Sequence, residues 1–293
     1  MKVTFWGVRG SIPSPGPKTV RYGGNTTCIE VRTDDGQLII LDAGTGIFPL
    51  SQTLFSEFPL HAHIFNTHPH WDHIQGLPFF IPLFVPNNRA TIYGAYDPIT
   101  QNSIEEILRV QLQYRFFPIR ECELNAKIDY VSLRESEKAT IGEVSITPVL
   151  LNHPVVNFGY RIDCRGKSLF FTGDFESPYN IYDPEDDEFE MYQSLLDQKE
   201  AQVLEQIHGV DLLIADSSYT EAEYPAKKGW GHGTFQSCMK LAEKAEAKQL
   251  ILTHHEPTRS DDALEAAFQE AMENYTADVP EIALAREGLS LEW

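Results

Sequence analysis

The feature that most constrains this chain is a short tract, Thr67-His68-Pro69-His70-Trp71-Asp72-His73, which follows an apolar run. It places three imidazoles and one carboxylate within six consecutive positions. Both groups are ligands that suit zinc and other divalent transition metals. Because a His-x-His pair followed by Asp and His can offer ligands in two directions, the tract predicts two metal ions side by side. A solvated histidine-rich loop is the alternative, and the remaining ligands must decide between the two.

Length and composition favour one large α/β domain. The 293 residues are 42% hydrophobic, and no change in composition marks a linker. We expect a single domain over residues 1–293, with a helical insertion near 95–120 and an acidic insertion near 178–208. No apolar stretch approaches the roughly 20 residues of a membrane helix, and the N-terminus lacks the pattern of a signal peptide. We therefore expect a soluble, cytoplasmic protein without a membrane partner.

Charge and cysteine content narrow the class of site and of substrate. The formal net charge of −20 repels a phosphate backbone at long range, so extended nucleic-acid binding is not expected. Two divalent cations would reverse the field locally, and a small anionic substrate is therefore allowed. The four cysteines are scattered without a Cys-x-x-Cys pair, which argues against a thiolate zinc site and a disulfide framework.

Three further residues, His153, Asp174 and His254, each follow an apolar strand pattern. Like the residues of the tract, they are of types that bind metals, and they are called metal-type residues below. Ligand sites of α/β sheets lie at the carboxyl ends of strands, so these residues can converge on the tract. Taken singly, each has an ordinary interpretation as a turn cap or a hydrogen-bonded polar residue. Their joint occurrence favours the metal site. Asp42 and Asp216 also end strands and are candidates for supporting the ligands.

Other segments carry more ordinary expectations. Ser103–Tyr114 is typical of an amphipathic helix with Ser103 as its N-cap, and a second helix is expected near Glu190–Ile207. We expect Arg9 and Arg21, in a loop rich in glycine and proline, to face water, with contact to a substrate anion as the alternative. His61 and His63 alternate along a strand and are expected to be structural.

The order of these residues resembles the dinuclear metallo-β-lactamase superfamily over essentially the whole chain. The resemblance implies an α/β fold, a four-layer αββα sandwich, with the metals in a groove at one edge of two sheets. The matching segments are the tract itself, Leu151-Asn152-His153-Pro154, Phe171-Thr172-Gly173-Asp174, Leu252-Thr253-His254, Ile40-Leu41-Asp42-Ala43-Gly44 and Gly23–Thr26.

The same resemblance implies a ligand set for two divalent metal ions, with Zn²⁺ favoured and Mn²⁺ or Fe as alternatives. Its members by position are His68, His70 and His153 for the first metal, Asp72, His73 and His254 for the second, and Asp174 as the bridge. His255 competes with His254, which we prefer because the family pattern places the ligand directly after the Leu-Thr pair.

Gly231-His232-Gly233-Thr234 resembles the catalytic histidine segment of the ribonuclease Z and cyclic-phosphate phosphodiesterase branch. A loop histidine of no consequence is the alternative. Two metals lower the pKa of a bridging water to about 7, so that hydroxide is available at neutral pH. We expect Asp72 to orient this hydroxide and His232 to protonate the leaving oxygen. The leading hypothesis is a phosphodiesterase acting on a small or cyclic nucleotide-type phosphodiester.

Other functions remain open at this point. A ribonuclease Z-like tRNA 3′ endonuclease is one, although that branch holds tRNA with a basic arm whereas Asp183–Glu190 is acidic here. A thioester or lactam hydrolase on the same metal pair is another. A di-iron oxygen-binding or sensing module is the third, weakened because no flavin-binding domain follows. A homodimer is compatible with each of them.

Overall fold

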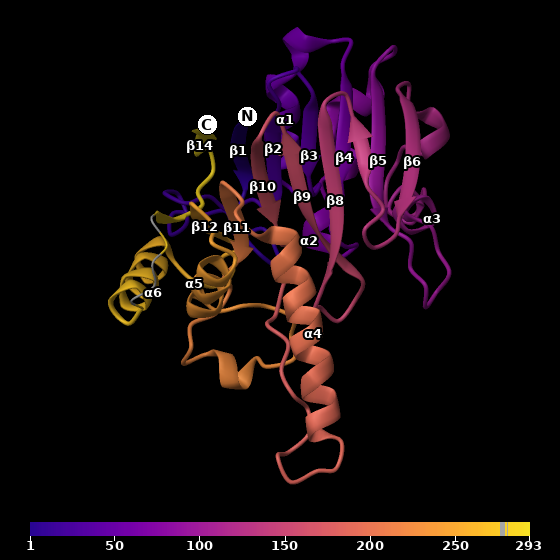
Figure 1. Cartoon of the computed structure of the whole chain (residues 1–293). Helices are drawn as coiled ribbons and strands as arrows, with labels where there is room; N and C mark the ends of the chain where they lie inside the picture. Colours follow the sequence, from indigo (N-terminus) through magenta and orange to yellow (C-terminus); the bar gives the residue numbers. More distant parts are fainter. Residues whose placement is uncertain (276–278, 280) are drawn as a thin grey trace.

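The strands form two sheets of seven strands each in the computed structural model, which describes residues 1–275, 279 and 281–293 (Figure 1). The first sheet has the order β14-β1-β2-β3-β4-β5-β6. Its strands are β1 (Lys2–Gly7), β2 (Cys28–Arg32), β3 (Leu38–Leu41), β4 (His61–Phe65), β5 (Arg89–Ala95), β6 (Lys127–Leu133) and β14 (Ser290–Glu292).

The second sheet has the order β13-β12-β11-β10-β9-β8-β7. Its central strands are short apolar runs, as expected for strands that are covered on both faces. Its strands are β7 (Ala139–Ile141), β8 (Val144–Leu151), β9 (Asn157–Cys164), β10 (Lys167–Phe171), β11 (Leu212–Asp216), β12 (Leu250–Thr253) and β13 (Ile282–Leu284).

Helices cover the outer faces of both sheets. Short helical turns and α1 pack on the first sheet, whereas α4 and α5 pack on the second. Within the described part of the chain the α-helices are α1 (Ile47–Thr53), α2 (Trp71–Ile74), α3 (Ile104–Arg109), α4 (Phe189–Ile207), α5 (Phe235–Lys244) and α6 (Asp261–Glu273). None of the described helices is long and apolar enough to cross a membrane.

The core follows from the alternation of side chains along each strand. In β10, Phe171 points into the apolar layer between the two sheets, whereas the neighbouring Phe170 packs beneath the helices. In β3, Ile39 lies between the sheets and Ile40 lies beneath the opposite helical layer. Because strands of both sheets bury both of their faces, the structure has the expected four layers in the order αββα.

Strand direction decides where the site forms. In the second sheet β10, β11 and β12 are parallel. Since β9 is antiparallel to both β8 and β10, β8 runs in that same direction. In the first sheet β3 and β4 are also parallel. The residues that follow these strands therefore meet at one edge of the sandwich.

Two local expectations need adjustment. The helix expected over Ser103–Tyr114 has its capping box at Ser103 but ends at Arg109, and the chain continues in turns. Arg9, expected in water, is fully buried: its guanidinium donates hydrogen bonds to Asp261 and to the carbonyl oxygen of Arg259. The expected helix near residue 190 is present as α4, which projects away from the sheets towards its N-terminal end (Figure 1).

Candidate metal centre

The seven residues expected to bind metal lie together at the sheet edge in two groups that share Asp174. In each group, one nitrogen or oxygen atom from every residue lies within 4.8 Å of the others. The first group contains His68, His70, His153 and Asp174, and the second contains Asp72, His73, Asp174 and His254. The tract thus supplies four of the seven residues, and three strand ends supply the rest.

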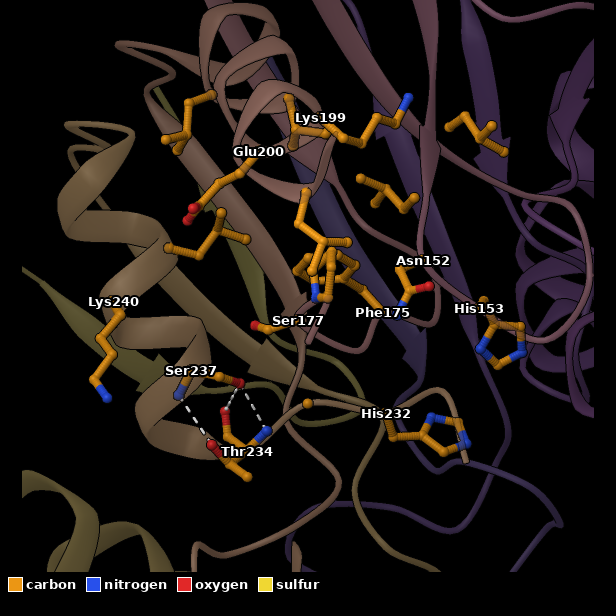
Figure 2. A pocket seen from close by; sticks show the side chains of 18 of the residues that line it. Asn152, His153, Phe175, Ser177, Lys199, Glu200, His232, Thr234, Ser237 and Lys240 are labelled. Atoms are coloured by element: carbon orange, nitrogen blue, oxygen red, sulfur yellow. Dashed lines mark hydrogen bonds between the residues drawn. The ribbon is translucent and has the colours of Figure 1, made fainter. Parts of the chain in front are cut away.

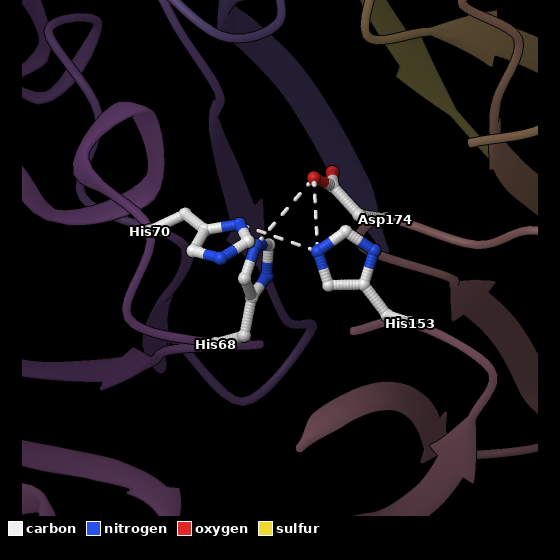
Figure 3. A group of neighbouring side chains, drawn as sticks. All are labelled: His68, His70, His153 and Asp174. Atoms are coloured by element: carbon white, nitrogen blue, oxygen red, sulfur yellow. Dashed lines mark hydrogen bonds and ion pairs between the residues drawn. The ribbon is translucent and has the colours of Figure 1, made fainter. Parts of the chain in front are cut away.

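The first group presents lone-pair atoms to a common point (Figure 3). Nδ1 of His70 lies 3.2 Å from Nε2 of His153, and Nε2 of His68 lies 3.4 Å from Oδ2 of Asp174. Nε2 of His68 is buried and has no hydrogen-bond partner among the described residues. A buried polar atom without a partner is costly. A divalent cation at this point would satisfy it, so the residues fit a metal.

The second group is arranged in the same way. Nε2 of His73 lies 3.4 Å from Nε2 of His254, and Oδ1 of Asp174 lies 3.1 Å and 3.0 Å from these two nitrogens. Oδ2 of Asp72 lies 3.2 Å from Nε2 of His254. Asp174 therefore faces the first group through one carboxylate oxygen and the second group through the other.

The opposite nitrogen of several imidazoles is held by the protein. Nδ1 of His73 donates to Oδ2 of Asp42 at 2.7 Å, and Nδ1 of His153 donates to the carbonyl oxygen of Gly231 at 2.9 Å. Nδ1 of His254 shares a hydrogen bond with the Ser218 hydroxyl at 3.0 Å. A proton on Nδ1 leaves the lone pair on Nε2, which is the tautomer that a metal ligand needs.

Electrostatics favour neutral imidazoles in the first group. Burial lowers the pKa of His153 to about 4 against the opposing effect of the Asp174 carboxylate. Burial also lowers the pKa of His68 and of His70. Because metals bind the neutral form of imidazole, these three residues compete little with protons for a cation.

Asp72 combines a polar setting with limited access to water. Its Oδ2 accepts a hydrogen bond from the backbone N–H of Ser11 at 2.7 Å, and 7% of its side chain is exposed. Burial alone would raise its pKa, but the charge of His73 and a hydrogen bond from His254 outweigh that effect and hold the pKa below its usual range. Asp72 is therefore a carboxylate at neutral pH.

The structure separates His254 from His255. His254 lies in the second group, whereas His255 points away and donates from Nε2 to the carbonyl oxygen of Ala285 at 2.8 Å. His254 adopts φ of 59°, in the left-handed region that costs free energy for a residue with a Cβ atom. Its imidazole packs so closely on Gly10 that a Cβ there would lie 2.3 Å from the ring.

His232 stands beside the second group. Its Nδ1 lies 2.8 Å from Oδ2 of Asp216 and 3.7 Å from Oδ2 of Asp174. Its ring stacks on that of His254, with the centroids 4.9 Å apart. Burial would lower the pKa of His232, but the charges of Asp216 and Asp174 outweigh burial and raise it. With Nδ1 bound to Asp216, Nε2 is the nitrogen left for a ligand or substrate.

Glu176 is a functional candidate that the sequence did not suggest. It is 2% exposed, and its two carboxylate oxygens accept hydrogen bonds from the backbone N–H groups of Gly229 and Gly231 at 2.8 Å and 2.9 Å. The Tyr224 hydroxyl donates to it at 2.7 Å. Gly231 has φ of 88°, and a Cβ there would lie 2.2 Å from Nδ1 of His153. Glu176 therefore holds the loop that carries His232.

The remaining candidates lie outside the centre. Arg9 is buried as described above, and Arg21 pairs with Asp262 at 2.6 Å on the surface. His61 and His63 contact residues of the neighbouring strand β5, in agreement with a structural role. None of these four side chains belongs to the groups of metal-type residues found in the described structure.

A cavity of about 740 Å³ adjoins the centre on the side of α4 and α5 (Figure 2). His153 and His232 are among the residues that line it. Most of the rest of its wall comes from the end of β8 and the segment after it, from the segment after β10, from α4 and from α5. One of the seven metal-type residues, His153, thus faces this cavity, and so does His232.

Comparison with known proteins is consistent with this geometry. A family model described as "Beta-lactamase superfamily domain" matches residues 37–255. Ribonuclease Z of Haloarcula marismortui is 24% identical over 318 residues, which cover 99% of this chain and 96% of that protein.

Two solved structures are similar over nearly their whole length. The metallo-beta-lactamase fold protein YhfI from Bacillus subtilis has a TM-score of 0.69 at 21% identity, covering 100% of this chain and 98% of that one. A diphosphatase from the PhnP family has a TM-score of 0.65 at 21% identity, and the match covers 100% of this chain and 97% of that chain. At these identities the two structures demonstrate a shared fold.

Proposed function

Because the chain belongs to the metallo-β-lactamase superfamily, in its ribonuclease Z-like branch, we propose that it is a metal-dependent phosphodiesterase acting on a small phosphodiester. The observation that carries the proposal is the placement of His232. It is held by Asp216 at 2.8 Å, next to two groups of metal-type residues that share Asp174. A poised imidazole beside a dinuclear centre suits a reaction in which an alkoxide or phenoxide must leave.

In this proposal the protein holds two divalent cations, most simply Zn²⁺, through the two groups described above. When bound, such cations supply a water of lowered pKa and positive charge opposite the phosphate oxygens. Asp72, fixed by the Ser11 N–H, orients the attacking water and accepts its proton. His232 donates a proton from Nε2 to the leaving oxygen, while Asp216 stabilises the imidazolium and keeps the ring in place.

The charge of the protein favours a small substrate over tRNA. The relative from Haloarcula marismortui is called ribonuclease Z, so a tRNA 3′ endonuclease is the second candidate. The projecting end of α4 is preceded by Asp183, Asp186, Asp187 and Glu188, and the whole chain carries −20. A polyanion would be repelled by this surface, whereas a single phosphodiester at the metal centre would not.

The test is a substrate panel with protein reconstituted with Zn²⁺ or Mn²⁺. Bis-p-nitrophenyl phosphate, 2′,3′- and 3′,5′-cyclic nucleotides, a tRNA precursor, a lactam and a thioester are compared under the same conditions. We expect turnover of small phosphodiesters, and little or none of the tRNA precursor, the lactam and the thioester. The absence of phosphodiester turnover with two metals bound would refute the proposal. Bound iron with an oxygen-responsive absorption band and no hydrolysis would favour an oxygen-binding module.

A further inference from the structure

The cavity beside the metal centre has a wall that does not match a purely polar substrate. Half-buried apolar side chains from three segments face it, among them Leu150, Phe175, Leu196 and Leu204. Its volume of about 740 Å³ lies within the range of roughly 300–1,000 Å³ that is usual for small-molecule sites. When a ligand displaces water from apolar surface in a cavity, the free energy of the system decreases.

The charges around the cavity cancel. Lys199, Lys240 and Lys244 line it together with three acidic residues, Asp197, Glu200 and Glu221. Two of these groups form an ion pair, since Lys244 contacts Glu200 at 2.5 Å. In a chain of net charge −20 this wall is neutral overall and selects neither a polyanion nor a polycation. Apart from uncharged polar side chains such as Asn152, Ser177 and Gln193, what remains to select a ligand is the apolar surface of the cavity.

The position of His232 tells which part of a substrate enters the cavity. Figure 2 shows His232 and His153 on one side of the cavity, with Glu200 and Lys240 on the other. A general acid must lie within hydrogen-bond reach of the oxygen that leaves. The group attached to that oxygen is therefore the one that lies against the cavity wall, while the phosphate stays with the metal-type residues.

We propose that this cavity is the leaving-group site and that the substrate is a phosphodiester of an uncharged, apolar alcohol or phenol. This inference rests on the proposed phosphodiesterase function and specifies its substrate class. The P–O bond to the apolar group breaks, water supplies the new P–O bond, and the proton on Nε2 of His232 passes to the leaving oxygen. The products are a phosphomonoester and the apolar alcohol or phenol.

Two esters with leaving groups of similar acidity test the inference: methyl 2-naphthyl phosphate and methyl phenyl phosphate. The larger ring system covers more of the cavity wall, so we expect its kcat/KM to be about tenfold higher. In Leu196→Asp a charge enters the wall, and this preference should fall to near unity because kcat/KM for the naphthyl ester falls more than kcat/KM for the phenyl ester. Leu196→Trp, which fills the space but stays apolar, should have the same effect.

Leu195→Asp is the matched control, since Leu195 is the adjacent residue of α4, is 53% exposed and does not line the cavity. It should keep the wild-type preference. Equal kcat/KM for the two esters in the wild type, or equal effects of Leu195→Asp and Leu196→Asp, would overturn the inference and leave the phosphodiesterase function standing.

A binding measurement separates the two proposals. The fluorescence of 2-naphthol, the product of the larger ester, is titrated with wild type, Leu196→Asp and Leu195→Asp. If protein with two bound metals hydrolyses neither these esters nor the phosphodiesters of the substrate panel, the phosphodiesterase function is overturned. The titration then tests only whether the cavity binds an apolar ligand. Weaker binding of 2-naphthol by Leu196→Asp alone supports an apolar ligand site, and equal binding by all three proteins refutes it.

Discussion

Nδ1 of His232 donates a hydrogen bond to Oδ2 of Asp216 at 2.8 Å, and Asp216 is completely buried at the end of β11. The pair connects a loop histidine to a strand in the centre of the second sheet. The imidazole is thereby fixed in orientation and in tautomer, with Nε2 directed away from the carboxylate. The same carboxyl group lies 3.5 Å from Nδ1 of His254 through its other oxygen. Asp216 thus links the proposed acid to a proposed metal ligand.

His232→Ala should leave two metals bound and reduce kcat for phosphodiesters by roughly a hundredfold or more. The reason is that His232 donates a proton to the leaving oxygen and holds no metal in the proposed mechanism. Metal content by elemental analysis and steady-state kinetics are measured on the same preparation. An ester with a very acidic leaving group should lose less rate. Loss of a metal ion instead would show that His232 is a ligand.

Glu176→Gln should disturb the loop that carries His232. Both oxygens of Glu176 accept from backbone N–H groups, and a Gln side chain has only one acceptor oxygen, so either orientation sets its NH₂ group against a glycine N–H. We expect kcat to fall by roughly 10- to 100-fold, together with weaker metal binding at His153, which donates to Gly231 of that loop.

The control for Glu176→Gln is Glu246→Gln, since the Glu246 side chain is 76% exposed. Metal titration followed at equilibrium and a KM-against-kcat comparison distinguish loop positioning from a general loss of stability. A Glu176→Gln protein with unchanged kcat and unchanged metal affinity would contradict the positioning role.

Asp42→Asn should weaken the second metal site selectively. Asp42 accepts a hydrogen bond from Nδ1 of His73 at 2.7 Å and two more from Thr67, and it is completely buried. An amide at this position no longer favours a proton on Nδ1 of His73, so affinity at that site should fall by about 10- to 100-fold. Zn²⁺ titration should reveal one tight and one weakened site, whereas Asp129→Asn, on the surface, should keep two tight sites.

Acid should destabilise the fold through His63. His63 is only 6% exposed. Its burial, reinforced by the nearby charges of His61 and Arg89, lowers its pKa to about 4. The unfolded chain therefore binds the proton first as the pH falls below about 6.5. The free energy of unfolding is therefore highest above that pH and decreases as the pH falls towards 4. The decrease should be roughly 2 kcal/mol between pH 7 and pH 5.

The measurement for His63 is urea unfolding of the metal-free protein at pH 7 and pH 5. His63→Gln should lose less stability than wild type over this interval, because it lacks the titrating group. His208→Gln, whose native side chain is 60% exposed, serves as the control and should follow the wild type. Equal losses in His63→Gln and wild type would count against the assignment.

Much of the architecture could be predicted from the sequence because its signals are local. Alternating apolar runs define the strands, and the capping box at Ser103 marks the start of α3. The metal-type residues follow strands that lie parallel in the sheets, so their convergence could be expected from topology alone. The tract from His68 to His73 was expected to need His153, Asp174 and His254, and the structure brings all of them together.

Tertiary packing decided what depends on partners distant in sequence. Glu176 accepts hydrogen bonds from the N–H groups of Gly229 and Gly231, which lie more than fifty residues later in the sequence. No local sequence pattern predicts a carboxylate that is bound by backbone amides. Arg9 is buried because Asp261 and backbone carbonyls from a remote loop satisfy its guanidinium.

The cavity is decided in the same way. Apolar side chains of α4, of α5 and of the segment that follows β8 face a common space there. The sequence determined by itself which residues can bind metal, since ligand chemistry belongs to the side chains. Only the tertiary structure decided what surrounds them, because the shape and charge of a cavity arise from elements that meet only when the layers pack.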